Sequence, residues 1–97
     1  MFAIINQLHL SKPPHEFLAP IEQELLPVLS SSSGYQSFHL VQVNEDRAIV
    51  IILFDSAAEA TDATNVIAPT WFAKHVAPHL ASEQQRSVGE VIFHHEA

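Results

Sequence analysis

The chain has 97 residues, of which 47% are apolar, and it carries eleven acidic against four basic side chains. This length and composition are typical of one compact domain, so we expect a single domain over residues 1–97. Four scattered cations do not form the basic surface that a polyanion requires, and nucleic acid is therefore not an expected partner. The absence of cysteine excludes disulfides, thiolate metal sites and thiol nucleophiles.

No stretch approaches the roughly 18 consecutive apolar residues of a membrane-spanning helix. The first residues, Met1 to Asn6, also lack the basic start of a secretory signal. We therefore expect no membrane segment and a cytoplasmic protein.

The first predicted element is a strand over residues 2–10, because β-forming residues dominate this segment. Side chains of a strand alternate between its two faces. Asn6 then lies among apolar side chains on one face, in the row Phe2, Ile4, Asn6, Leu8 and Leu10. A polar amide in an apolar row must find a partner, either in the fold or in a ligand.

An amphipathic helix is predicted from Leu18 to Leu29, because apolar residues recur there at spacings of three and four. Pro20 is compatible with a first helical turn, whereas Pro27 is expected to kink or loosen the last turn. A serine-rich loop follows, and its Gly34 is suited to a left-handed backbone conformation.

The next two strands are predicted over residues 35–43 and 48–54, joined by a polar turn, as in an antiparallel hairpin. Alternation places Tyr35, Ser37, His39, Val41 and Val43 on one face of the first. The second is the unbroken apolar run Ala48–Phe54, which indicates a strand buried on both faces. Helices of this chain are expected to cover one face of the sheet and a second copy of the chain the other.

Ser56 and Glu59 have the spacing of a helix-capping box, so a helix begins there and extends through Ala68. Pro69 favours an extended residue before it and is expected to interrupt that helix. Pro69 also suits the first turn of a new helix. A second helical piece is predicted over residues 70–80, then a polar loop over 81–86 and a last strand over 88–95.

The element order is thus β-α-β-β-αα-β, which predicts an α+β, ferredoxin-like fold with one antiparallel sheet and helices on one face. The open face predicts a homodimer.

The segment from Trp71 to Leu80 is the best candidate for a functional site. At about 100° per residue, a helix here places Trp71, Phe72, His75, Val76 and His79 within half its circumference. Histidine exchanges protons near neutral pH, so His75 and His79 are candidate catalytic residues. Ordinary packing of histidines on an amphipathic helix is the alternative.

We expect a pocket that Asn6 and Phe38 line from the sheet and Trp71, Phe72, Val76 and the two histidines line from the helix. Its expected ligand is a small apolar or aromatic compound, with Asn6 orienting a carbonyl or phenol. A histidine is expected to deprotonate the phenol, and Asn6, the third candidate catalytic residue, to help hold the resulting oxyanion. The histidines at positions i and i+4 also match a metal-binding pair, but no third ligand is near in sequence, and we expect no metal.

The order of elements, the interrupted second helix, Asn6 on the first strand and Trp71 followed by a histidine resemble the antibiotic biosynthesis monooxygenase group of the dimeric α+β barrel superfamily. The resemblance covers nearly the whole chain. It implies a dimer whose two sheets close into an α+β barrel, with a small-molecule pocket between each sheet and its helices. It also implies either cofactor-free oxidation of aromatic compounds or oxidative haem breakdown.

Haem-degrading members use an Asn, a Trp and a His from the corresponding elements, which here are Asn6, Trp71 and either His75 or His79. Their histidine lies farther beyond the tryptophan than either histidine does here. We therefore expect a cofactor-independent monooxygenase acting on a small aromatic compound. Alternatives are a non-enzymatic binding or assembly protein and a haem-binding or haem-degrading protein.

Overall fold

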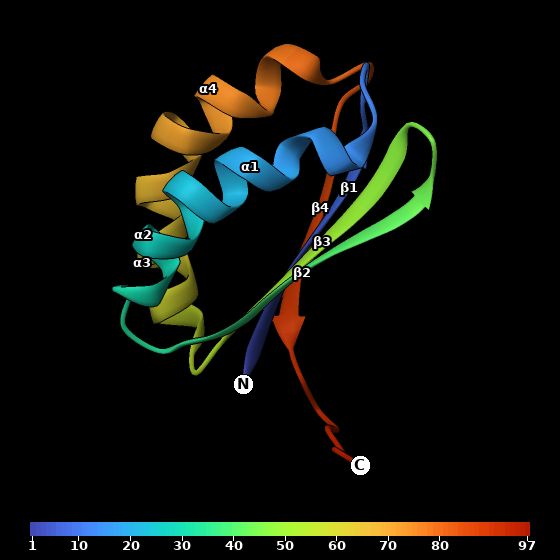
Figure 1. The fold of residues 1–97 in the computed structure, drawn as a ribbon. Coiled ribbons are helices and arrows are strands. Elements are labelled where there is room, and N and C mark those ends of the chain that lie inside the picture. Colours follow the sequence, from blue (N-terminus) through green and yellow to red (C-terminus); the bar gives the residue numbers. More distant parts are fainter.

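A single four-stranded antiparallel sheet forms one layer of the molecule, and all helices pack on one of its faces (Figure 1). The computed structural model describes residues 1–97. The strand order is β2-β3-β1-β4, so β1 and β3 are central and β2 and β4 are edges. This confirms the predicted ferredoxin-like fold. The strands are β1 (Phe2–His9), β2 (Tyr35–Asn44), β3 (Arg47–Phe54) and β4 (Gln85–Glu90).

The first helical layer consists of four short pieces in place of one regular helix. They are the 3-10 turn η1 (Pro14–Phe17), α1 (Leu18–Pro20), the π-helical turn η2 (Ile21–Leu25) and α2 (Leu26–Ser30). Pro20 precedes the π-turn and Pro27 follows it. Each proline lacks a backbone donor, and the hydrogen-bond pattern changes between them.

This irregularity corrects the predicted apolar face of the first helix. Ile21, Leu25 and Leu29 are buried, as expected, but Leu18 is 46% exposed and Val28 is 36% exposed. The predicted apolar face assumed the constant rotation per residue of an α-helix, and the 3-10 and π turns rotate by different angles.

The second helical layer runs through α3 (Ala57–Ile67), the π-turn η3 (Ala68–Phe72), α4 (Ala73–His75) and the 3-10 turn η4 (Ala77–His79). Pro69 lies in the first turn of a new helical piece, as predicted, but the expectation of an extended residue before it is wrong. Ala68 is helical, with φ −60° and ψ −49°. Pro69 lies in the first turn of η3, where a missing donor costs little, so the chain continues without a break. None of the helices is both long and apolar enough to cross a membrane.

The predicted cap of α3 is present with one difference. Ser56 Oγ accepts from the backbone N–H of Glu59 at 3.3 Å, as a capping box requires. The Glu59 carboxylate does not return to the Ser56 backbone. It accepts instead from Ser56 Oγ at 3.0 Å and from Ser33 Oγ at 2.6 Å. This carboxylate therefore joins the start of α3 to the loop that contains Gly34, whose φ is +74°.

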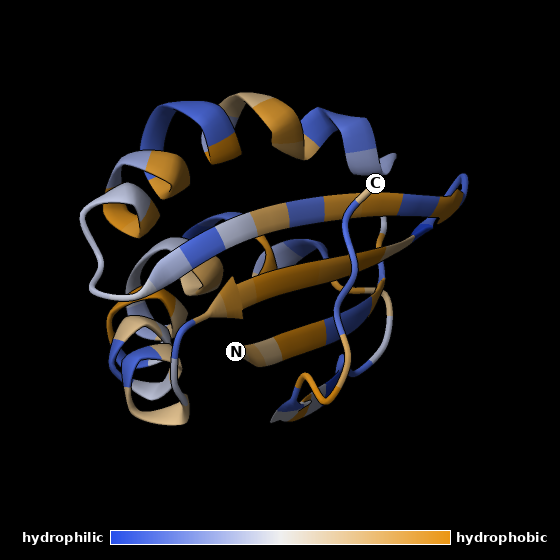
Figure 2. Cartoon of the chain, turned by 90° about the horizontal axis from the view of Figure 1, so that it is seen from below, coloured by the Kyte–Doolittle hydropathy of each residue, from blue (hydrophilic) through white to orange (hydrophobic).

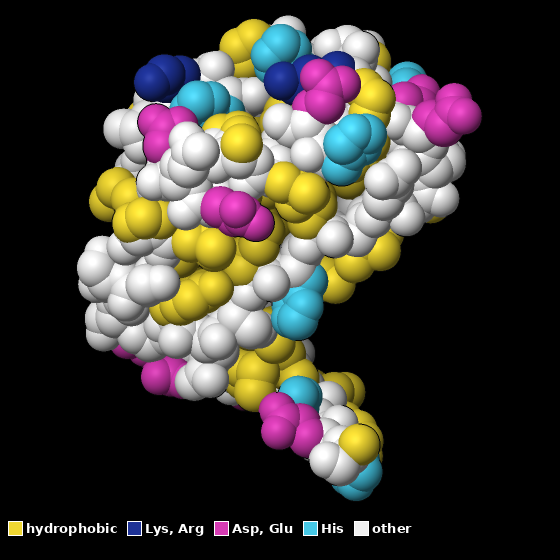
Figure 3. Space-filling model, in the orientation of Figure 1, with side chains coloured by type: hydrophobic (Ala, Val, Ile, Leu, Met, Phe, Trp, Pro, Cys, Tyr) yellow, Lys and Arg dark blue, Asp and Glu magenta, His cyan; other side chains and the backbone are white.

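The last strand starts and ends earlier than predicted, at Gln85 and Glu90 in place of 88 and 95. β4 pairs only with β1, from Gln85 opposite Gln7 to Glu90 opposite Phe2. Because β1 begins at Phe2, the residues after Glu90 have no partner strand beyond one bond from Val91 N–H to the Met1 carbonyl. Residues 91–97 leave the body of the molecule as a tail (Figures 1 and 3).

The strand pairing decides which side chains face the helices. Ala48, Ile52 and Phe54 of β3 are buried beneath the helices, while Ile49, Ile51 and Leu53 lie half-buried on the open face. Figure 2 shows β3 as apolar along nearly its whole length. The core joins these residues to both helical layers; it comprises Ile4, Leu8, Leu10, Phe17, Ile21, Leu25, Leu29, Ala48, Ile52, Phe54, Ala60, Ala63 and Val76.

A β-bulge at the start of β2 corrects one predicted face. The register shifts between Tyr35 and Ser37, so that Tyr35 lies opposite Phe54 and Ser37 opposite Leu53. Tyr35 therefore packs against the core on the helix side, with its ring 6.1 Å from that of Phe54. An inserted residue reverses the alternation for the residue before it.

Candidate functional site

A cavity of about 110 Å³ lies between the sheet and the helices. Hydrophobic residues make up 17 of the 21 residues in its wall, so a molecule that fills it must be mostly apolar. β1, β2 and β3 form its floor, and the helical layers form its roof; the main floor residues are Ile4, Asn6, Leu8, Phe38, Leu40, Val50 and Ile52.

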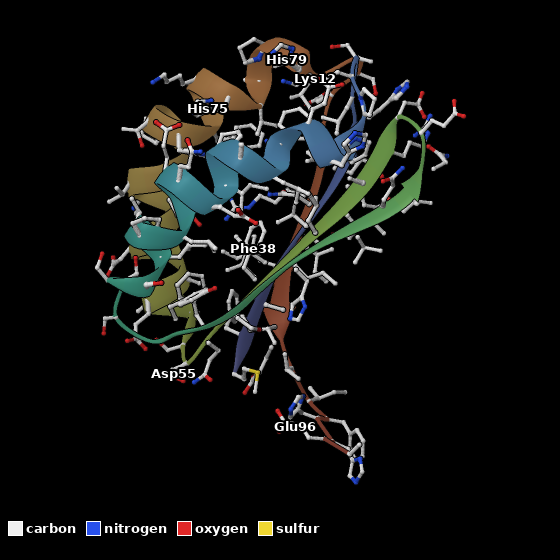
Figure 4. The ribbon with its side chains drawn as sticks, in the orientation of Figure 1. Lys12, Phe38, Asp55, His75, His79 and Glu96 are labelled. Atoms are coloured by element: carbon white, nitrogen blue, oxygen red, sulfur yellow. The ribbon has the colours of Figure 1, made fainter.

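Five of the predicted site residues line this cavity: Asn6, Phe38, Trp71, Phe72 and Val76. Figure 4 shows Phe38 on β2 between the sheet and the helices. With Phe17 and Phe54, the wall contains five large aromatic side chains, from the sheet and from both helical layers. Such surfaces suit a flat apolar ligand.

Trp71 is held in place by a hydrogen bond to the other helical layer. Its indole Nε1–H donates to the carbonyl of Pro20 at 3.1 Å. That carbonyl lies next to the π-turn, where the regular hydrogen-bond ladder is altered. The irregular first layer therefore provides the acceptor that fixes the aromatic wall.

The expectation that His75 and His79 line the pocket is wrong, because neither belongs to the wall of the cavity. In Figure 4 both lie on the helical layer, away from Phe38. The prediction that these side chains share one half of the helix circumference assumed a uniform helix over residues 70–80. The chain instead passes from a π-turn to one short α segment and then to a 3-10 turn. Each type rotates the chain by a different angle per residue, which separates positions that the uniform helix aligns.

His75 lies behind Trp71 and contacts the first helical layer. The centroids of the two rings are 5.5 Å apart, with their planes at 41°. His75 Nε2 lies 2.5 Å from Glu24 Oε2, and Lys74 Nζ lies 3.8 Å from Glu24 Oε1. His75 Nε2 and the Glu24 carboxylate do not have the geometry of a hydrogen bond. Their contact is therefore an ion pair when the imidazole is protonated.

His79 packs edge-on against Phe17, with ring centroids 6.1 Å apart and planes at 74°. Its backbone carbonyl accepts from the N–H of Ser11. His79 therefore contributes to the packing of the two layers at the end of the sheet, which is the alternative that the sequence left open.

Four polar side chains line the cavity: Asn6, Thr64, Gln84 and Arg86. Asn6 Oδ1 and Gln84 Oε1 are buried and have no hydrogen-bond partner within the chain. An unpaired buried polar group costs about 1–3 kcal/mol, so the fold retains these two acceptors at the expense of stability. Both are available to a ligand.

Sequence reasoning missed Thr64, Gln84 and Arg86. The first lies in an Ala/Thr-rich helix without a distinctive pattern. The other two fall in the segment predicted as a polar loop. The alternation of Gln84, Arg86 and Val88 was the available signal, because a strand that begins at Gln85 places Arg86 opposite Asn6.

An outer groove adjoins the cavity between α3 and β4. Its volume is about 440 Å³, and it shares Ile4, Thr64 and Arg86 with the wall of the inner cavity. Its remaining wall contains several exposed side chains, among them Thr61, Asn65 and Val88. An Arg86 Nη2–H donates to Thr64 Oγ1 at 3.3 Å, which joins β4 to α3 where the two spaces meet.

The residues of the cavity do not fit haem. An axial ligand to haem iron is a His, Cys, Met or Tyr side chain, and none of these lines the cavity. No group of three His, Asp or Glu side chains gathers elsewhere in the chain. The cavity therefore offers an apolar space with amide, hydroxyl and guanidinium groups, and its chemistry must use those groups.

No protein-family model matches the chain, and no curated protein is similar to it in sequence. Its fold, however, matches many solved structures. SnoaB from Streptomyces nogalater, a cofactor-independent oxygenase, superposes with a TM-score of 0.77 at 10% identity, over 96% of this chain and 94% of that one.

Two further structures share the fold. A mutant of MhuD with two manganese protoporphyrin IX molecules bound per active site has a TM-score of 0.73 at 19% identity, over the full length of both chains. A dimeric ferredoxin-like protein from an uncultured marine organism has a TM-score of 0.75 at 15% identity, also over both full lengths. Proteins described as antibiotic biosynthesis monooxygenases, from Nitrosomonas europaea and Bordetella bronchiseptica, also share the fold, so the resemblance seen in the sequence to that group is confirmed for the fold.

Proposed function

We propose that this chain binds a small aromatic compound in the inner cavity and oxidises it with molecular oxygen, without a cofactor. The observation that carries the proposal is an apolar, aromatic-lined cavity in which the carboxamide of Asn6 has no hydrogen-bond partner. Its oxygen can accept from a substrate hydroxyl, and its N–H groups can donate to the oxygen of the ionised substrate. SnoaB, which has the same fold, is a cofactor-independent oxygenase. An apolar site with few convergent polar groups suits a phenolic or anthrone-like substrate.

The reaction balances without an external reductant. When the CH₂ group between the aromatic rings of an anthrone becomes a carbonyl, the substrate loses two hydrogens and gains one oxygen atom from O₂. The second oxygen atom leaves as water with those two hydrogens. The substrate supplies all four electrons, so the protein has to bind and ionise it and no more.

Asn6 is the residue that we propose for stabilising the ionised substrate. A carboxamide offers two N–H donors and one acceptor, so it can hold a phenolate or enolate oxygen in an apolar site. No His, Asp or Glu lines the cavity, and the substrate proton is therefore lost to water. Phe38, Trp71, Phe72 and Val76 would contact the aromatic body.

The same absence of a lining base favours a second candidate, the binding of an aromatic compound without chemistry. Oxygen consumption by purified protein with an anthrone and a hydroquinone separates the two. We expect uptake that falls about 100-fold in Asn6→Ala, the loss typical of removing one oxyanion donor. Gln7→Ala is the matched control, because Gln7 is exposed and lies on the opposite face of the same strand. Binding without uptake across both substrates would favour the second candidate.

We also propose that a second copy of the chain covers the open face of the sheet. A row across the strands, from His39 through Ile51 and Ile5 to Ser87, has an apolar centre, and none of the helices covers this face. Ile92 and Phe93 of the tail are 95% and 82% exposed. Apolar surface of this extent is typical of an interface, and the marine structure of this fold is dimeric.

A further inference from the structure

Arg86 differs from the other three basic residues of the chain in its position. It is the one charged residue in the wall of the inner cavity, and it also lines the outer groove. Neither wall contains an acidic residue, and Arg86 forms no ion pair. Its single side-chain partner is the neutral hydroxyl of Thr64. A guanidinium has five donors, so most of them are free for a ligand.

Arg86 also stands next to the polar group of the proposed site. It lies directly opposite Asn6 in the pairing of β1 with β4. Directly opposite side chains of an antiparallel pair share one face, with Cβ atoms about 5 Å apart. The guanidinium and the Asn6 carboxamide, whose N–H groups are also donors, therefore lie together at the junction of the two spaces.

The size of the inner cavity restricts which part of a ligand it can hold. An apolar cavity of about 150 Å³ is enough for benzene. The inner cavity, at about 110 Å³, is smaller than this, so it can hold no more than a single aromatic ring. A larger ligand must extend past Arg86 into the groove of about 440 Å³ between α3 and β4.

We propose that the ligand is an aromatic compound with an anionic group, that its ring lies in the inner cavity, and that Arg86 binds the anion at the junction with the outer groove. This inference rests on the proposed function, since it names the substrate class of the same site. Arginine is suited to it because its planar fork binds carboxylates and sulfonates through two parallel hydrogen bonds. An ionised substrate would also be stabilised by the same positive charge.

Two fluorescent probes with the same aromatic body test this proposal. One is 8-anilinonaphthalene-1-sulfonate, which is anionic, and the other is N-phenyl-1-naphthylamine, which lacks the sulfonate. We expect the protein to bind both. In Arg86→Gln, the affinity for the sulfonate should fall about tenfold, or about 1.4 kcal/mol, while that for the neutral probe stays unchanged. Arg86→Lys should recover part of the loss.

Arg47→Gln is the matched control, because it removes the same net charge from an exposed position that lines neither space. It should leave both affinities unchanged. If Arg86→Gln binds the sulfonate as well as the parent does, the role of Arg86 is refuted and the proposed function stands. If the parent binds neither probe, the cavity is not a ligand site and both proposals fail. Far-ultraviolet circular dichroism of each variant verifies that the fold is intact.

Discussion

The imidazole of His75 packs against the indole of Trp71, with 5.5 Å between ring centroids. Trp71 lines the cavity and His75 does not. His75 therefore acts on a ligand only through the position of the tryptophan. The imidazole of His75 also contacts the carboxylate of Glu24, in the other helical layer.

Replacing His75 by alanine tests this indirect role. We expect the kcat of oxygen uptake to stay within about twofold and the KM to rise a few-fold, because Trp71 loses support while no reacting group is removed. His75→Gln, which retains a side chain of similar reach, should recover most of the KM. A kcat loss of about 100-fold or more in both variants would show that His75 is a catalytic base after all.

Asn6→Leu should increase stability while it abolishes function. The substitution removes a buried oxygen that has no partner, and we expect the free energy of unfolding to rise by about 1–2 kcal/mol. Urea unfolding followed by circular dichroism measures the change. Gln7→Leu, at an exposed position, should change stability by less than about 0.5 kcal/mol. An unfolding free energy that falls in Asn6→Leu would mean that the native amide is satisfied in solution.

Burial raises the pKa of the Tyr35 hydroxyl above its ordinary value of 10.0. The protonated form is favoured in the folded state, so the stabilising effect is complete below pH 10 and is lost as pH rises through the higher folded pKa. Tyr35 is the single tyrosine, so its phenolate absorbance near 295 nm can be followed without interference from another tyrosine.

We expect the absorbance midpoint to lie above 10 in the native protein and to return to about 10 in concentrated urea. Tyr35→Phe should show a smaller loss of stability than the parent between neutral pH and pH 11. Equal native and unfolded midpoints would contradict burial of this hydroxyl.

Ile51→Glu should separate the proposed dimer. Ile51 lies at the centre of the open face, between His39 and Ile5, and a charge there must be desolvated when a second sheet covers it. Light scattering at micromolar concentration should give twice the 10.8 kDa mass of one chain for the parent and the monomer mass for the variant. Val66→Glu, at an exposed position of α3, is the control and should remain dimeric. A monomeric parent would refute the proposed dimer.

The sequence predicted the elements and their order, because hydrophobic periodicity and capping are local properties. The run Ala48–Phe54 and the pair Ser56 and Glu59 each identified an element without knowledge of its neighbours. The error at Pro69 was also local. A proline in a first helical turn is compatible with a helical residue before it, as Ala68 shows.

The site was predicted only in part, for a geometric reason. Asn6, Phe38, Trp71, Phe72 and Val76 line the cavity, as the alternation of strands and the position of Trp71 indicated. His75 and His79 lie elsewhere because two changes of helix type accumulate rotation between Ala68 and His79. Such changes depend on packing against the other layer, which a single segment does not encode.

The sequence alone thus determined that β3 is apolar on both faces, which predicts that both faces of the sheet are buried against other elements. The tertiary structure decided that Ala48, Ile52 and Phe54 face the helices, because pairing with β1 and β2 fixes the register of the whole sheet. The same pairing placed Arg86 opposite Asn6. Residues 80 positions apart meet only when strands align, and no local pattern contains that information.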